Sequence, residues 1–400
     1  MRQKRQATTG SHLVKSIMRR VAIAGIGQVP VQKQYELGLR ELGADVIAQA
    51  LQGVDKRKVQ ALYLSNMLSD ELQSQKHLAA LVADEAGLSG IEALQVRAAT
   101  AAGAAALRVA FLAVASGAVD LALAVGVEKM SDQVPTAALA KALDARIEVP
   151  DGKTLLSQNA ELMGAYLAHY NLADDALAAF SVNAHDNARG NPNALFKNRQ
   201  YTTGEVMSSR YIYPPLRLLD CAPVCDGAAA VLLAPLSKAR KFSDVVVELV
   251  ASSAASDRFR IADRPNPLIL SAAVASVEQA LKQAGISRDK IDFFELHDAF
   301  SIVACLSLEA AGFAVPGRGW ELAESGEIRP GGSIPVATMG GLKARGHPIG
   351  ATALYQTCEI VQQLSGRAGS NQLDEPRFGM LQSIGGPGST VLTHIFTTAH

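Results

Sequence analysis

The sequence predicts an α/β fold made of two similar halves, and three observations lead to this prediction. The chain has 400 residues, 48% of them hydrophobic, with 33 glycines, so it can bury a larger core than one compact unit usually holds. Apolar strands alternate with helical segments, which indicates crossover connections and a parallel sheet. An apolar strand that leads through a turn into an apolar helix occurs twice, at residues 94–117 and 291–312, as a structural repeat.

The first half begins with VAIAGIG at residues 21–27, which reads as a buried strand entering a turn. Gly25 and Gly27 match the first two glycines of a dinucleotide-binding turn, but Pro30 stands at the third, where close helix packing is required. We therefore do not expect a nucleotide fold. The further elements predicted in this half are strands at 61–65, 94–96 and 120–127 and helices at 39–50, 77–86 and 101–116.

Residues 128–216 interrupt the alternation of strands and helices. Helical stretches at 155–170 and 174–187 are followed by a polar segment with several prolines. A sheet that inserts so long a stretch usually uses it to build or cover a site. We therefore predict a loop domain here.

A strand at 227–235 closes the first half, and the second half repeats the plan of the first. Its predicted elements are a strand at 245–250, a helix at 268–284, a strand at 291–296 and a helix at 301–311. The predicted units are a tag or disordered tail at 1–18, an N-terminal half at 19–236 and a C-terminal half at 237–400. Because ligands bind at the carboxyl ends of parallel strands, the strand-to-helix turns of both halves should meet at one cleft.

Composition excludes several classes of protein. Lys plus Arg and Asp plus Glu both number 38, so no basic surplus favours nucleic acid and no acidic excess favours disorder. Four cysteines without disulfide-scaffold spacing indicate a reducing compartment, the cytoplasm. Cys221 and Cys225 lack a second pair, so we interpret them as packing residues and expect no metal.

The sequence also predicts a protein without a membrane segment or a targeting signal. No apolar run is expected to reach the roughly 18 residues of a membrane helix, since Gly117 and Asp120 interrupt the longest one. Residues 1–20 are basic but lack the apolar run of a secretory signal, so a tag residue or an upstream start explains them better than a transit peptide.

Four turns gather the residues that could carry chemistry: VRAATAAG at 96–103, ELHDAF at 295–300, GGLKARGHPIGAT at 340–352 and SIGGPGST at 383–390. His347 stands just ahead of a helix, on a backbone kept open by its glycine neighbour. A single buried histidine such as His297 is more often structural than catalytic. The glycines allow a ligand to approach backbone N–H groups, or they simply form tight turns.

Together these turns resemble the thiolase superfamily, in its archaeal and sterol-carrier-protein branch of acetyl-CoA acetyltransferase-like proteins. GGLKARGHPIGAT is similar to that family's GHP loop, HDAF to its second-half motif and SIGGPGST to its C-terminal glycine loop, and the likeness runs from about residue 21 to residue 396. The resemblance implies a five-layered αβαβα thiolase fold with the loop domain over the cleft. It also implies a central helix layer, whose two helices we expect to begin near Ala101 and Ser301.

The family's chemistry starts from a cysteine thiolate at a helix N-terminus, which attacks an acyl-CoA thioester and holds the acyl group. The resemblance makes His347 the base and His297 an oxyanion donor, with the Gly385 N–H in a second oxyanion hole. The further substrate-binding positions that it implies are Gly341, Gly386 and Ser383. No permanent cofactor is implied, only a coenzyme A thioester as substrate or ligand.

The chain departs from the family where the acyl group would be held. Thr100 stands at the position of the nucleophilic cysteine, and a threonine hydroxyl has a far higher pKa than the roughly 8.5 of a thiol. The two places where the family carries its second cysteine hold Ser383 and Ala299, and Ala337 replaces the usual asparagine. Thiolysis through a cysteine acyl-enzyme is therefore not expected.

We accordingly predict a thiolase-like protein that acts on or binds acyl-CoA thioesters, an acyltransferase by family type, with three interpretations open. One is a carbon-carbon bond reaction without an acyl-enzyme, such as retro-aldol cleavage. Another is slow acyl transfer through Thr100, and the third is a non-catalytic CoA-thioester-binding subunit. The resemblance implies a homodimer through the first half, or a dimer of dimers, and a small OB-fold zinc-ribbon partner.

Overall fold

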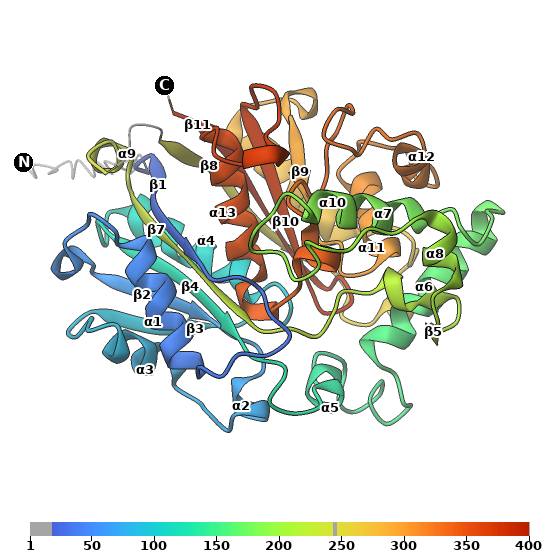
Figure 1. Cartoon of the computed structure of the whole chain (residues 1–400), viewed down its shortest axis with the longest axis horizontal. Helices are drawn as coiled ribbons and strands as arrows, with labels where there is room; N and C mark the ends of the chain where they lie inside the picture. Colours follow the sequence, from blue (N-terminus) through green and yellow to red (C-terminus); the bar gives the residue numbers. More distant parts are fainter. Residues whose placement is uncertain (1–17, 243–245, 400) are drawn as a thin grey trace, which may run out of the picture.

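The computed structural model describes residues 18–242 and 246–399, and in this part of the chain one sheet of nine strands runs through the whole molecule (Figure 1). Residues 1–17 of the predicted tail and Val245, the predicted strand start, lie outside the described residues. The strand order is β3-β2-β4-β7-β1-β8-β11-β10-β9. The bounds are β1 Val21–Gln28, β2 Ala61–Ser65, β3 Glu92–Val96, β4 Ala122–Glu128, β7 Gly227–Pro235, β8 Val247–Ser256, β9 Phe293–Glu295, β10 Phe378–Gly385 and β11 Thr390–Thr398.

The sheet is mixed, so the prediction of a parallel sheet was wrong in part. β2 lies parallel to β3 and β4, and β9 lies parallel to β10, whereas β1, β7, β8 and β11 pair antiparallel with their neighbours. The four-residue turn between β10 and β11 is too short for a crossover and forces an antiparallel pair. The alternation of apolar strands with helices led to that prediction, but helices also cover both faces of the antiparallel strand β7.

Three buried clusters define five layers, which confirms the predicted thiolase fold. The sheet divides into a first half-sheet, β3-β2-β4-β7-β1, and a second half-sheet, β8-β11-β10-β9. The outer helices of the first half, α1 (Leu39–Ala50) and α3 (Leu78–Glu85), cover one face of the first half-sheet. The helices α4 (Ala102–Ser116) and α13 (Thr352–Leu364) fill the space between the two half-sheets. The helices α10 (Ser271–Ala284) and α11 (Ser301–Ala310) cover the far face of the second half-sheet.

The expectation that a helix near Ser301 belongs to the central layer was wrong, because α13 takes that place. α11 packs against α10 and against the loop-domain helices α6 and α7. The apolar surface of α11 suggested full burial, whereas α13 carries polar side chains that the structure buries with partners. Gln356 on α13, for example, donates to the carbonyl oxygens of Glu295 and Leu296 at 3.2 and 2.9 Å.

The central helix α4 also corrects the expectation about membrane spans. The segment Ala99–Ser116 has the length and, with a mean hydropathy of 1.6, the composition of a spanning helix. Gly117 and Asp120 follow it and do not interrupt it. In the structure this segment packs between the two half-sheets, and 56% of it is buried, so a core position accounts for its apolar character.

The glycines of β1 serve packing between helix and sheet. A Cβ atom at Gly25 would lie 2.0 Å from the Ala50 carbonyl oxygen, and one at Gly27 would lie 2.2 Å from that of Val46. Both contacts are with the backbone of α1, so only glycine allows this helix to lie so close to its strand. This explains the GxG pattern without a nucleotide.

The loop-domain helices α6 and α7 pack on the second half, whereas α5 packs near α2 of the first half (Figure 1). Its longest helix, α6, begins with a capping box in which Thr154 and Ser157 exchange side-chain to backbone hydrogen bonds. The elements of this domain are α5 Thr136–Ala140, α6 Leu155–Tyr170, α7 Ala178–Ala188, α8 Thr203–Ser208, β5 Tyr211–Tyr213 and β6 Leu216–Arg217. The remaining short helices are α2 Ser69–Leu72, α9 Leu236–Ala239 and α12 Gly319–Glu324.

Candidate active site

Four of the predicted site residues line one cavity of about 470 Å³. Thr100 lies in the turn between β3 and α4, and His297 follows β9, so each half contributes one strand-to-helix turn. His347 precedes α13, and Gly386 lies in the turn between β10 and β11. The cavity thus collects the turns that the sequence singled out.

The two imidazoles lie against each other in a nearly perpendicular arrangement. The ring centroids of His297 and His347 are 5.3 Å apart, with an angle of 87° between the planes. Burial lowers the pKa of His297 to about 3. Burial also lowers the pKa of His347 well below its usual value, and His297 and Arg345 lower it further. Both rings are therefore neutral near pH 7, so each can accept a proton or donate one hydrogen bond.

A hydroxyl group fixes the orientation of the His347 ring. The Nδ1 atom lies 2.7 Å from the Thr352 Oγ1 atom, which itself donates to the Pro348 carbonyl oxygen at 3.2 Å. Because the hydroxyl proton goes to Pro348, the oxygen accepts the Nδ1 proton of the imidazole. The Nε2 atom of His347 is then left with its lone pair, which is the form that a general base requires.

The backbone around His347 is tightly packed. Its N–H donates to the Cys225 sulfur at 3.1 Å. The preceding Gly346 has a φ of +116°, and a Cβ atom there would lie 2.6 Å from a methyl group of Val31. Only glycine meets both conditions, so this glycine serves to place the histidine.

Thr100 is held by backbone groups and makes no hydrogen bond to either imidazole among the described residues. Its hydroxyl donates to the Ile384 carbonyl oxygen at 2.7 Å and accepts the Gly386 N–H at 3.1 Å. The preceding Ala99 has a φ of +47°, a strained value for alanine that belongs to the sharp turn. The hydroxyl proton is thus engaged by a backbone carbonyl, and the hydroxyl oxygen accepts the N–H that Gly386 could otherwise offer to a ligand.

Three predicted site residues do not line the cavity. Gly385 pairs with Thr390 within the β10–β11 ladder, and the buried Ser383 hydroxyl has no hydrogen-bond partner in the described chain. Gly341 has a φ of +54°, and a Cβ atom there would lie 2.5 Å from the Asp298 carboxylate. Gly341 therefore fits the tight-turn interpretation, since it allows the Asp298 carboxylate to accept the Leu342 N–H at 2.7 Å.

Cys221 also lines the cavity, which the sequence did not reveal. Its thiol donates to the Arg217 carbonyl oxygen at 3.3 Å. Burial raises the pKa of the Cys221 thiol to about 12, and burial raises that of Cys225 to about 12 as well. Both sulfurs remain thiols near pH 7, which argues against a substitute thiolate nucleophile. The sequence favours a packing role for Cys221, and no local pattern around it indicates a place at the cavity.

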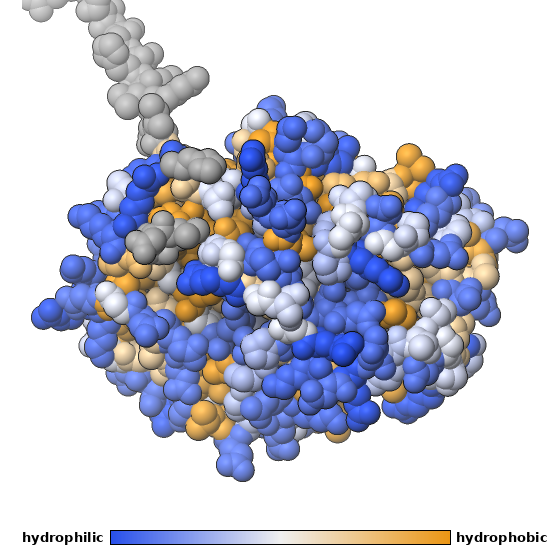
Figure 2. Space-filling view, turned by 45° about the horizontal axis from the view of Figure 1, so that its top comes forward, coloured by the Kyte–Doolittle hydropathy of each residue, from blue (hydrophilic) through white to orange (hydrophobic). Residues whose placement is uncertain are grey.

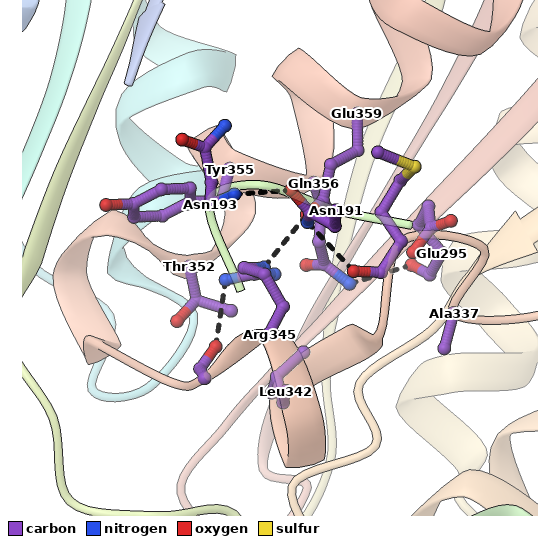
Figure 3. A network of polar contacts seen from close by, with 12 residues as sticks. Asn191, Asn193, Glu295, Ala337, Leu342, Arg345, Thr352, Tyr355, Gln356 and Glu359 are labelled. Atoms are coloured by element: carbon purple, nitrogen blue, oxygen red, sulfur yellow. Dashed lines mark hydrogen bonds and ion pairs between the residues drawn. The ribbon is translucent and has the colours of Figure 1, made fainter. Parts of the chain in front are cut away.

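A buried polar network supports the loop that carries His347 (Figure 3). Arg345 and Glu359 form an ion pair at 3.0 Å, with both side chains almost fully buried. Asn191 of the loop domain donates to the same Glu359 carboxylate at 3.3 Å. The Glu295 carboxylate accepts the hydroxyl of Thr338 at 2.6 Å. These contacts join the loop domain, the GHP loop and α13. The charged residues of LKARGHP, inside an otherwise buried segment, were the feature of the sequence that could have indicated this network.

Comparison with known proteins decides the family. Residues 21–237 match the thiolase N-terminal domain, and residues 253–398 match a domain described as thiolase C-terminal domain-like. The chain belongs to the thiolase family. The resemblance in the sequence is thereby confirmed, whereas the assignment of Thr100 to the nucleophile position stays a prediction.

Similar proteins place this thiolase-family chain among archaeal and sterol-carrier-type relatives. It is 40% identical to an acetyl-CoA acetyltransferase of Methanothermobacter thermautotrophicus, over 95% of the chain and 100% of that protein. It is 28% identical to human sterol carrier protein 2, over 94% of the chain and 72% of that protein. The solved structure "Ltp2-ChsH2(DUF35) aldolase" has the same fold, with a TM-score of 0.84 at 21% identity over 96% of this chain and 98% of that one.

Proposed function

We propose that this protein binds an acyl-CoA thioester and makes or breaks the bond between C2 and C3 of its acyl group without a covalent acyl-enzyme. The observation that carries the proposal is the position of the Thr100 hydroxyl. It donates its proton to the Ile384 carbonyl oxygen and accepts the Gly386 N–H, and neither of these groups is a base that could remove the proton. The two neutral imidazoles, in contrast, face the same cavity.

In the cleavage direction the substrate is a 3-hydroxyacyl thioester. The Nε2 atom of His347 accepts the proton of the 3-hydroxyl, and the oxygen electrons form the carbonyl of the departing aldehyde or ketone. The electrons of the bond between C2 and C3 pass to the thioester, which becomes an enolate. A neutral His297 stabilises the enolate oxygen by donating one hydrogen bond. The proton on His347 then returns to C2, which yields the shortened acyl-CoA.

Acyl transfer through Thr100 is the second candidate. It is favoured by the relatives, because proteins that are 40% and 36% identical are named acetyl-CoA acetyltransferase. It requires the Thr100 hydroxyl to leave the Ile384 carbonyl and turn toward His347. The Gly386 N–H, freed by that movement, would then be available to a substrate oxygen.

We further propose that the protein associates with a second copy and with a small OB-fold zinc-ribbon protein. The similar aldolase structure carries the name Ltp2-ChsH2(DUF35), which includes a DUF35 component. β3 lies at the end of the sheet, and its Leu94 is 52% exposed, so this edge can pair with another chain.

The test is incubation with a panel of 3-hydroxyacyl-CoA compounds and, separately, with acetoacetyl-CoA plus CoA. The enolate mechanism predicts release of an aldehyde or ketone, no adduct in intact-mass spectra, and activity that survives Thr100→Ala but not His347→Ala. An acetyl adduct on Thr100 would instead establish acyl transfer. Binding of the thioesters without any turnover, with or without the candidate partner, would contradict both reactions and leave a binding role.

A further inference from the structure

The cavity that holds His297 and His347 extends far beyond the reacting groups, along an apolar wall. We propose that this wall binds a long or bulky apolar acyl group, so that the substrate is a thioester of such an acid and not an acetyl thioester. The inference rests on the proposed function, since it names the substrate class of the same site.

The wall is built by the loop domain on one side and by the second half on the other. Its buried or half-buried apolar side chains come from five separate parts of the chain. They are Met130, Leu156, Leu162, Leu270, Val303 and Ile349. Convergence of side chains from so many segments on one empty space indicates a built site, because interiors are otherwise closely packed.

Exposure of the lining residues identifies the mouth of the cavity. Val134, just before α5, is 82% exposed, and Val224, just before β7, is 48% exposed. The deep wall residues Leu162, Leu270 and Val303 are buried. The apolar character therefore continues from the mouth into the interior. On the face seen in Figure 2, by comparison, hydrophobic residues are scattered among hydrophilic ones.

One polar side chain, Asn159, interrupts the deep part of the wall. Its Nδ2 atom donates to the Leu155 carbonyl oxygen of its own helix at 2.8 Å, so its polar edge is partly satisfied by α6. The amides of a pantetheine arm would find few partners there. A hydrocarbon chain gives up no hydrogen bonds when it leaves water for such a wall.

The size of the cavity agrees with this assignment. A volume of about 470 Å³ lies within the range of roughly 300 to 1,000 Å³ found for sites that enclose drug-sized ligands. The methyl group of an acetyl thioester would leave most of the wall without contact. Each methylene buried on the wall should strengthen binding about fourfold.

The experiment compares binding of CoA, acetyl-CoA and octanoyl-CoA to the full-length protein by isothermal titration calorimetry. None of the three carries a 3-hydroxyl, so none is cleaved by the proposed reaction. Because octanoyl-CoA has six more methylenes than acetyl-CoA, we expect it to bind at least about a hundredfold more tightly. Equal affinity for acetyl-CoA and octanoyl-CoA would overturn the inference. Failure of all three to bind would instead overturn the proposed function on which it rests.

Cavity-filling variants locate the binding surface. Leu156→Trp places an indole on the wall and should remove most of the affinity advantage of octanoyl-CoA over acetyl-CoA. The matched control is Ala168→Trp, which puts the same side chain on the exposed face of the same helix. Leu139→Trp on α5, whose side chain also lines the cavity, repeats the test from another helix of the loop domain, with melting temperatures to verify folding. Retention of the octanoyl-CoA advantage in both folded wall variants would overturn the inference.

Discussion

At the scale of single residues, the state of His347 depends on one hydroxyl group. Thr352 can accept the Nδ1 proton because its own proton is donated to Pro348. Replacing Thr352 by valine keeps the shape and removes the acceptor, so Nδ1–H would be left buried without a partner. We expect the proton to move to Nε2 in Thr352→Val, which abolishes the base. Nitrogen chemical shifts of ¹⁵N-histidine-labelled protein report the tautomer directly, and Thr352→Ser should keep the original one.

A second prediction at this scale concerns Thr100. If its hydroxyl serves mainly to join the turn before α4 to the β10–β11 turn, then Thr100→Val should destabilise the fold. The buried Ile384 carbonyl and Gly386 N–H would each lose a partner, at a cost of about 1–3 kcal/mol in the free energy of unfolding. Urea denaturation measures this cost. Thr100→Ser, which retains the hydroxyl, is the control, and an unchanged stability of the valine variant would refute the structural role.

Residue chemistry was predictable where a local motif carried it. The GHP and HDAF turns indicated His347 and His297, and the helix start after VRAAT indicated Thr100. The bond from Thr100 to Ile384 was not predictable, since 284 positions of sequence separate the two. The same holds for the ion pair of Arg345 with Glu359, whose partners meet only because α13 lies in the central layer.

At the scale of elements, β3 invites a prediction about association. It ends the sheet, so one side of its backbone lacks a neighbouring strand within the described chain, and the apolar Leu94 side chain is exposed there. We expect Leu94→Lys to shift the protein toward the monomer, because edge lysines oppose strand pairing. Size-exclusion chromatography with light scattering measures this shift. Val315→Lys, at a valine of the second half that is 63% exposed, should leave the mass unchanged.

The bounds of elements with a clear hydrophobic periodicity were predicted well. The layer in which a helix lies was not predicted well, because it depends on tertiary contacts. The bounds of β2 and α6 follow directly from apolar patterning. The exchange of α11 for α13 in the central layer has a physical reason. Hydrogen bonds to the strands and loops can bury a polar helix as completely as apolar side chains can. Hydrophobic periodicity in the sequence indicates the apolar face of a helix, but it gives no information about hydrogen-bond partners that lie far away in the sequence.

At the scale of the whole molecule, burial of neutral histidines makes stability depend on pH. His394 on β11 is fully buried, and its Nε2 atom lies 3.2 Å from the Ala104 carbonyl oxygen of the central helix. Burial lowers the pKa of His394 to about 3. In the unfolded chain this imidazole takes up a proton near its ordinary value of about 6.5, so its contribution is present above that pH and is lost as the pH falls toward 3.

Other buried groups act in the opposite direction, so the prediction is a difference between two proteins. Burial raises the pKa of the Glu128 carboxyl to about 7, which favours the folded state as the pH falls through that value. This contribution is the same in wild type and in His394→Gln. Between pH 8 and pH 5 the wild type should therefore lose about 2 kcal/mol more stability than the variant. Urea unfolding at both pH values measures the difference, and parallel losses would mean that His394 is solvated or charged in the folded protein.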